Sequence, residues 1–188
     1  DESGHPGWEP RPLPAPELPP ARAARLPKLL PHRFLEDAEA SVWIDANYSV
    51  RCDLDRLVSE ALNEAEIAFF AHPQRDCVYE EAEACVRLGK DDPELIAAQM
   101  ARYRAAGYPA HNGLVAAGVV VRRNTLAVRA FCERWWSELE AGSHRDQLSA
   151  PYVVERTGVE YAVLGDDPWT SPRFDFRPHA GQGPAPRP

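Results

Sequence analysis

The stretch SVWIDANYSV, residues 41–50, indicates both the fold class and the candidate site of this chain. Its first half carries β-branched and aromatic residues between polar ones, which is typical of a strand. Asp45 and Asn47 follow two residues apart, where that strand should end. Asp and Asn often end strands because they favour turns. The same oxygens could instead bind Mg²⁺ or Mn²⁺, so Asp45 has two interpretations.

Outward from this strand, helices and strands are expected to alternate. Apolar residues recur at helical spacing in five segments, namely 54–65, 76–89, 93–106, 125–141 and 145–157. Apolar runs predict further strands over residues 67–72, 115–121 and 159–165. The alternation predicts an α/β fold with a single domain, in which a mostly parallel, Rossmann-like sheet is flanked by helices.

Proline dominates both ends of the chain, where most of its 19 prolines lie. Because proline removes a backbone donor, these ends can form little regular structure. We expect an extended segment over residues 1–20, a compact domain over 21–169 and a disordered tail over 170–188. Trp135 and Trp136 could form a sugar platform, but their spacing favours core packing for Trp135 and a half-exposed position for Trp136.

Composition excludes some classes of partner. The net charge of −8 argues against a nucleic-acid backbone or an anionic membrane as the main partner. The four cysteines show no paired spacing, which indicates reduced thiols and a cytoplasmic protein. No apolar run is long enough to span a membrane, and no signal peptide is recognisable. The sequence lacks an initiator Met, so we expect it to be part of a longer protein.

Two polar segments could complete a site at Asp45. A basic segment precedes the strand, with Arg22, Arg25, Lys28, His32 and Arg33 in a chain that is otherwise acidic. Cations beside an acidic turn suit a diphosphate, although Arg22 and Arg33 are better explained as a solvated helix face.

The second segment is SHRDQLS, residues 143–149. Asp146 could cap the following helix. Near a sugar, Asp146 and Gln147 could instead bind hydroxyls, and Asp146 could act as a base on the acceptor.

Six ordered blocks carry a resemblance to a known family: KLLPHRF, SVWIDAN, HPQRDCVYEEA, GLVAAGVVVRRN, FCERWWSEL and SHRDQLS. They resemble the glycosyltransferase-like domain that was first catalogued as a domain of unknown function and is now named after the plant TOD1 and MUCI70 proteins. The likeness covers roughly residues 8–169. It implies a GT-A-like fold with a DxD-like motif that binds a divalent metal and a nucleotide sugar.

The resemblance also implies roles for individual residues. Asp45 and Asn47 take the place of the DxD motif and would bind Mn²⁺ or Mg²⁺. Asp146 is implied as the catalytic residue. The residues implied in binding the donor or the acceptor are Lys28, His32, Asp45, Arg75, Glu81, Asn112, Gly113, Arg145 and Gln147. The block HPQRDCVYEEA has no role that we can derive, and Glu80 and Glu81 could simply lie on an exposed helix face.

Two departures from the family pattern affect these expectations. Asn47 replaces the second carboxylate of a full DxD motif, which leaves the metal site with one charge fewer. The family domain normally opens with an upstream strand that should hold the nucleotide base, and this sequence starts after that point. We therefore expect an exposed sheet edge.

Three functions are compatible with these residues. The first is a metal-dependent glycosyltransferase that moves a hexose from a nucleoside-diphosphate donor, UDP-linked by expectation, to a hydroxyl on a saccharide. The second is a catalytically silent module that binds glycans or nucleotides. The third is a metal-dependent hydrolase that uses Asp45 and His32 on a phosphoester or amide.

Overall fold

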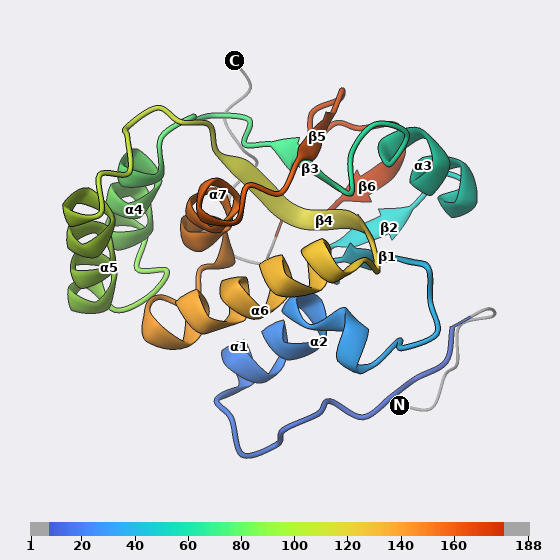
Figure 1. The fold of residues 1–188 in the computed structure, drawn as a ribbon, viewed down its shortest axis with the longest axis horizontal. Helices are drawn as coiled ribbons and strands as arrows, with labels where there is room; N and C mark the ends of the chain where they lie inside the picture. The colour runs from blue at the N-terminus through green and yellow to red at the C-terminus, as the bar shows by residue number, and fades with distance from the viewer. Residues whose placement is uncertain (1–7, 179–188) are drawn as a thin grey trace.

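A mixed four-stranded sheet forms the centre of the protein, in a computed structural model that describes residues 8–178 (Figure 1). Its strands lie in the order β1-β4-β3-β5. Their bounds are Ala40–Ile44 for β1, Ile67–Ala71 for β3, Val115–Arg123 for β4 and Tyr161–Leu164 for β5. The pairs β1–β4 and β3–β4 are antiparallel, and β3–β5 is parallel.

The prediction of a mostly parallel sheet is therefore wrong, although the α/β class is confirmed. Three strands, β1, β3 and β5, do run in one direction, as the alternation with helices predicted. The strand β4 runs in the opposite direction and lies between β1 and β3, so two of the three pairings become antiparallel. A consequence matters for the site: the carboxyl ends of β1 and β3 lie at the same edge of the sheet as the amino-terminal half of β4.

Both faces of the central strands β3 and β4 are covered, which explains why β3 and the first seven residues of β4 are apolar. Alternate residues of β3 and β4 contribute to two separate cores, with Phe69 and Val120 in one and Phe70 and Val121 in the other. The first core includes residues of α2 (Arg25–Leu29), α4 (Val78–Arg87), α5 (Pro93–Ala105), α6 (Leu126–Ala141) and α7 (Asp146–Thr157). The second includes residues of α3 (Leu54–Ala61) and of the two-stranded sheet formed by β2 (Tyr48–Val50) and β6 (Phe174–Phe176).

The basic segment before β1 folds as two short helices, α1 (Pro20–Ala23) and α2, followed by the 3₁₀ turn η1 (Pro31–Arg33). Figure 1 shows α1 and α2 beside α6, which crosses one face of the sheet. Trp135 on α6 is fully buried, as predicted, whereas Trp136 is 8% exposed rather than half-exposed. The Trp135 indole donates to the Asp146 carbonyl and the Ser149 hydroxyl, which fixes the start of α7 against α6.

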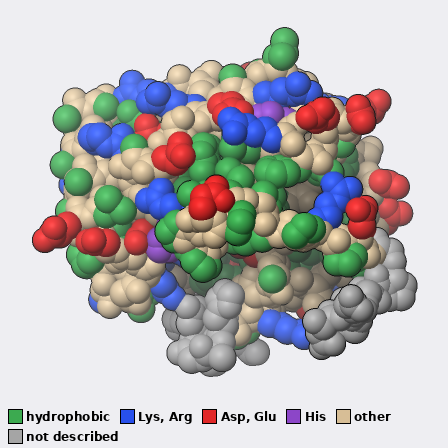
Figure 2. All heavy atoms as spheres, turned by 90° about the horizontal axis from the view of Figure 1, so that it is seen from below, with side chains coloured by type: hydrophobic (Ala, Val, Ile, Leu, Met, Phe, Trp, Pro, Cys, Tyr) green, Lys and Arg blue, Asp and Glu red, His purple; other side chains and the backbone are tan. Residues whose placement is uncertain are grey.

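The two ends of the described chain lie on the surface of this core. Residues 8–19 form no helix or strand, and their Trp8 and Leu13 side chains are exposed. Figure 2 views the protein from the side of α1 and α2 and shows hydrophobic side chains in the middle of this face, with charged ones around them. The strand β6 lies within the segment 170–188 that was expected to be a tail. The remainder of that segment, 179–188, lies outside the described residues.

The described cysteines carry free thiols: Cys77, Cys85 and Cys132 are buried, and Cys52 is partly buried. Among the helices of residues 8–178, none combines the length and the apolar character needed to cross a membrane.

Candidate functional site

A polar cavity of about 230 Å³ opens at the sheet edge where β1 and β3 end. Its lining comes from α2, the β1–β2 turn, β4, α4, the start of α7 and the segment around β6. The lining residues are Arg25, Lys28, Asp45, Asn47, Tyr48, His72, Glu81, Lys90, Ala117, Gly118, Arg145, Asp146, Gln147, Trp169 and Phe176. Four of these side chains are cationic and three are carboxylates, so the cavity carries an excess of positive charge in a chain of net charge −8.

The Lys28 ammonium joins two carboxylates across this cavity. Lys28 lies on α2, and its side chain is only 2% exposed. Its Nζ atom lies 3.2 Å from Asp45 Oδ1 and 2.6 Å from Asp146 Oδ2. An ammonium this deeply buried requires paired charge, which the two carboxylates supply. The contact therefore links the end of β1 to the first turn of α7.

Asp45 is fixed at the cavity by its own turn. Its backbone N–H donates to the Gly118 carbonyl on β4, and its carbonyl accepts from the Tyr48 N–H. The Trp43 indole donates to Asp45 Oδ1 at 2.7 Å. The Asp45 side chain nevertheless remains 38% exposed, in contrast to Asp146 at 4%. Asp45 is thus the carboxylate of this pair that a ligand in the cavity could reach.

Gly118 allows the turn to pack closely against β4. A Cβ atom at this position would lie 2.8 Å from the Tyr48 ring, which is closer than van der Waals contact permits. The Tyr48 ring in turn packs against Phe174 and Phe176. Burial raises the pKa of the Tyr48 hydroxyl, and the neighbouring Asp45 raises it further. Tyr48 is therefore a neutral hydroxyl beside Asp45.

Asp146 is a buried anion within a group of cations. Burial alone would raise the pKa of its carboxyl, but the charges of Lys28 and Arg25 outweigh burial, and the pKa lies below its usual value. Arg25 Nε lies 3.8 Å from Asp146 Oδ2. An anion held in this way is a weak base. The geometry suits Asp146 to positioning Lys28 and Arg25 better than to proton transfer.

The opposite wall combines His72 at the end of β3 with Glu81 on α4. Both side chains are at least nine-tenths buried. Arg75 Nε donates to Glu81 Oε2 at 2.6 Å. His72 Nδ1 accepts from the backbone N–H groups of Gln74 and Arg75, which assigns the ring proton to Nε2, 3.6 Å from the same Glu81 oxygen.

Burial lowers the pKa of His72 despite the Glu81 charge, so the ring is neutral at pH 7. This wall accounts structurally for the block HPQRDCVYEEA. Its two adjacent glutamates differ in burial, because Glu81 is buried in the site and Glu80 is exposed.

The structure brings together seven of the residues predicted from the sequence. Lys28, Asp45, Asn47, Glu81, Arg145, Asp146 and Gln147 line the cavity. Arg75 lies just behind the lining, bonded to Glu81. Asn112 is exposed, and Gly113 has a positive φ of 83° in the loop before β4; neither lines the cavity.

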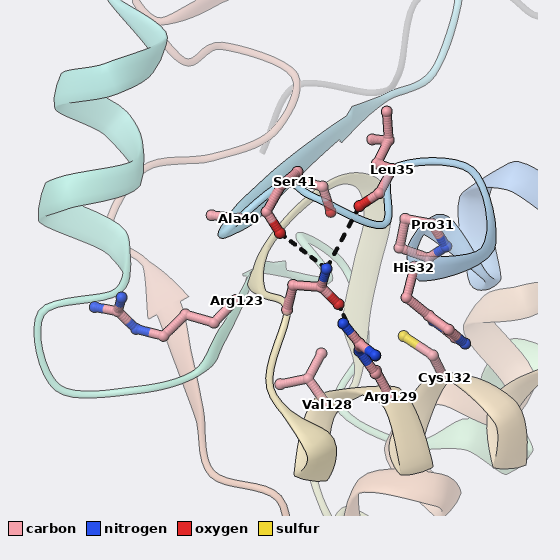
Figure 3. Close-up of a pocket in the computed structure, with 11 residues that line it drawn as sticks. Pro31, His32, Leu35, Ala40, Ser41, Arg123, Val128, Arg129 and Cys132 are labelled. Atoms are coloured by element: carbon pink, nitrogen blue, oxygen red, sulfur yellow. Dashed lines mark hydrogen bonds between the residues drawn. The ribbon is translucent and has the colours of Figure 1, made fainter.

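His32 lies at a different place on the surface. Its Nε2 is 2.8 Å from Glu133 on α6, and it lines a small hollow with Cys132 and Ser41 (Figure 3). Pro31 begins a 3₁₀ turn after α2, so His32 faces α6 while Lys28 faces Asp45. The expected donor contact of His32 at the Asp45 site therefore does not occur.

Several lining residues were not selected from the sequence. His72, Lys90, Tyr48, Gly118, Trp169 and Phe176 all line the cavity. A signal did exist for His72, since it ends the strand after the one that carries Asp45. Lys90 and the β6 segment belong to parts of the chain that are distant from Asp45 in sequence. No local sequence pattern indicates that they line the cavity.

The residues at Asp45 fit a divalent cation poorly. Asp45 Oδ1 already accepts from Trp43 and Lys28, Asp146 is buried against the same ammonium, and Asn47 offers a neutral oxygen. Among residues 8–178, a group of three or more possible ligand side chains close enough to share one ion occurs at Asp76, Glu80 and His111, all exposed. The metal expected from Asp45 and Asn47 stays a prediction.

Comparison with known proteins identifies one family. The model of the family described as "TOD1/MUCI70, glycosyltransferase-like domain" matches residues 15–164. The Arabidopsis thaliana protein named "Probable hexosyltransferase MUCI70" is 29% identical over 149 residues, which cover 74% of this chain and 26% of that protein. The Arabidopsis thaliana protein named "Alkaline ceramidase TOD1" is 29% identical over 147 residues, which cover 72% of this chain and 32% of that protein. The chain thus spans less than a third of the length of either relative. No solved structure matches it.

Proposed function

Because the chain belongs to the TOD1/MUCI70 glycosyltransferase-like domain family, we propose that it transfers a hexose from a nucleoside-diphosphate sugar, with UDP as the expected nucleotide, to a hydroxyl of a glycan acceptor. The observation that carries the proposal is the cavity at Asp45. Its walls are polar and it carries an excess of cationic side chains in an acidic chain. A nucleoside-diphosphate sugar has the matching chemistry, with a doubly charged diphosphate between two groups that carry many hydroxyls.

The reaction requires charge stabilisation at one end of the cavity. The bond between the anomeric carbon and the diphosphate oxygen breaks, and the diphosphate leaves with the electron pair. Fixed cations near the leaving oxygen stabilise this charge without reorganisation. Arg25, Lys28 and Arg145 are held by protein contacts in the cavity, which suits them to this role. The acceptor hydroxyl forms the new bond to the anomeric carbon and gives its proton to a base.

The carboxylates of Asp45 and Asp146 have different roles in this proposal. Asp45 is the more exposed one, and it would bind a hydroxyl of the sugar or of the acceptor. Asp146 stays a prediction as the catalytic base, and its low pKa favours a positioning role. The His72 Nε2–H group on the opposite wall and the Gln147 amide at the start of α7 would donate to sugar oxygens.

Amide hydrolysis, which the name of one relative suggests, has less support from the cavity. Ceramide carries long acyl chains that need an apolar channel, whereas charged and polar residues dominate this lining. A silent binding module would use the same contacts as the transferase and differs from it only in turnover.

Thermal unfolding with added ligands tests the proposal. A ligand that binds the folded state raises the melting temperature. UDP and a UDP-hexose should raise it, whereas the free hexose should do so weakly and a short-chain ceramide not at all. Stabilisation by ceramide without any effect of UDP would contradict the proposal.

A further inference from the structure

The Lys28 ammonium lies where a metal ion would have to lie in order to be bound by both Asp45 and Asp146. Its Nζ lies within 3.2 Å of Asp45 Oδ1 and within 2.6 Å of Asp146 Oδ2. A divalent cation bound by the same oxygens would lie beside a buried ammonium. Like charges at such short separations repel strongly where water is excluded. The protein therefore supplies its own cation at this position.

Other cations in the cavity remain available to an anion. Lys90 lines the cavity and forms no ion pair within the described part of the chain. The Nε atom of Arg145 is buried and has no hydrogen-bond partner among residues 8–178, whereas the Nε atom of Arg25 lies 3.8 Å from Asp146 Oδ2. Buried polar groups normally have partners, so unpaired donors beside a cavity suggest that a ligand supplies the acceptors. Phosphate oxygens are suitable acceptors for guanidinium and ammonium groups.

We propose that Lys28 replaces the divalent metal between Asp45 and Asp146, so that Arg25, Lys90 and Arg145 bind a nucleoside diphosphate without any metal ion. The inference rests on the proposed function and adds to it the way in which the diphosphate is held. Asn47 agrees with it, because a neutral side chain in place of a second carboxylate suits a site that holds no divalent ion.

Titration calorimetry with UDP tests this inference on the full chain. The dissociation constant in EDTA should agree with that in millimolar Mn²⁺ within about threefold, or less than about 1 kcal/mol. A loss of binding of about tenfold or more in EDTA would overturn the inference but leave the proposed function intact. Absence of UDP binding in both solutions would overturn the proposed function and the inference with it.

Replacing Lys28 gives a second prediction, because Mn²⁺ should bind to this variant but not to the site of the wild-type protein. In Lys28→Ala, two carboxylates lose their cation, and Mn²⁺ should now bind between them and raise the melting temperature. The protein with Lys28 intact should show no such rise, when each protein compared also carries His111→Asn to remove the exposed group of possible ligands at Asp76, Glu80 and His111. Lys90→Met is the matched control, because Lys90 has no carboxylate partner in residues 8–178, and this variant should stay insensitive to Mn²⁺.

Stabilisation by Mn²⁺ of the His111→Asn protein with Lys28 intact, or equal stabilisation of all three proteins, would overturn the inference. If Lys28→Ala does not fold in EDTA, its refolding on addition of Mn²⁺ supports the inference.

Discussion

Lys28 Nζ on α2 lies 2.6 Å from Asp146 Oδ2 on α7, although the two residues are 118 positions apart in the sequence, and both side chains are almost fully buried. This ion pair connects two elements that also meet α6, since Trp135 holds the start of α7. The charges that would bind substrate are therefore part of the packing of the domain, and substitutions here should affect both stability and binding.

Replacing Lys28 with Met should destabilise the protein by about 3–5 kcal/mol, because Asp146 is left as an uncompensated buried charge. Adding Asp146→Asn should recover part of this loss. The measurement is urea unfolding at pH 7, with Lys90→Met as the control for a loss of one positive charge. A cost below about 1 kcal/mol for Lys28→Met would show that the pair does not hold the site together.

Gly118→Ala should displace Tyr48 and with it the turn that carries Asp45. The added Cβ would lie 2.8 Å from the Tyr48 ring, and overpacking of this kind costs about 1–3 kcal/mol. UDP affinity should fall together with stability. Gly165→Ala is the matched control, because a Cβ there meets nothing within 4 Å. Equal effects of the two substitutions would contradict the packing role of Gly118.

Acidification should weaken the folded state through His72. Burial lowers the pKa of His72 in the folded protein. The neutral ring therefore contributes fully to stability above the pKa of the unfolded state, which is about 6.5. This contribution is lost as the pH falls below that value. His72→Asn keeps an acceptor for the backbone N–H groups and should flatten the fall in stability from pH 6.5 downward. His111→Asn is the control, since His111 is exposed and its pKa is raised by Asp76. An unchanged slope in His72→Asn would exclude His72 as the titrating group.

Glu81→Gln should reduce transfer while the fold persists. The variant keeps the shape of Glu81 but weakens its charge-assisted bond to Arg75, and such bonds contribute about 1.5–3 kcal/mol. We expect lower stability and a lower kcat/KM. Glu83→Gln removes the same charge from the exposed face of α4 and should have no effect. A similar kinetic loss in both variants would indicate a general charge effect.

Local patterns predicted the elements of the fold better than their arrangement. The apolar strand before Asp45, the helix that begins after Asp92 and the two-faced burial of β4 all follow from short-range sequence, and the structure confirms them. The direction of β4 depends on the end of the sheet at which the chain re-enters it after α4 and α5. The alternation of helices and strands in the sequence does not indicate which end that is.

For the site, as for the fold, the sequence predicted individual residues better than their arrangement in space. Lys28 and Asp45 were expected at one site, and they line the same cavity. His32 was named with Lys28 from the basic segment and the family resemblance, but the turn at Pro31 directs it to Glu133. His72 was overlooked because its position at the end of an apolar strand was interpreted only as a strand boundary. Because ligands of α/β proteins bind beside the carboxyl ends of strands, the position of His72 at the end of a predicted strand was a usable signal.

The most direct test of the central claim is the release of UDP from a panel of UDP-hexoses, measured with and without glycan acceptors. The account predicts release that depends on the acceptor and falls by about a hundredfold or more in Asp45→Ala, as expected when a group that binds the transition state is removed. Release that is equally fast without any acceptor, or absence of release from every donor by a protein that cleaves ceramide, would contradict it.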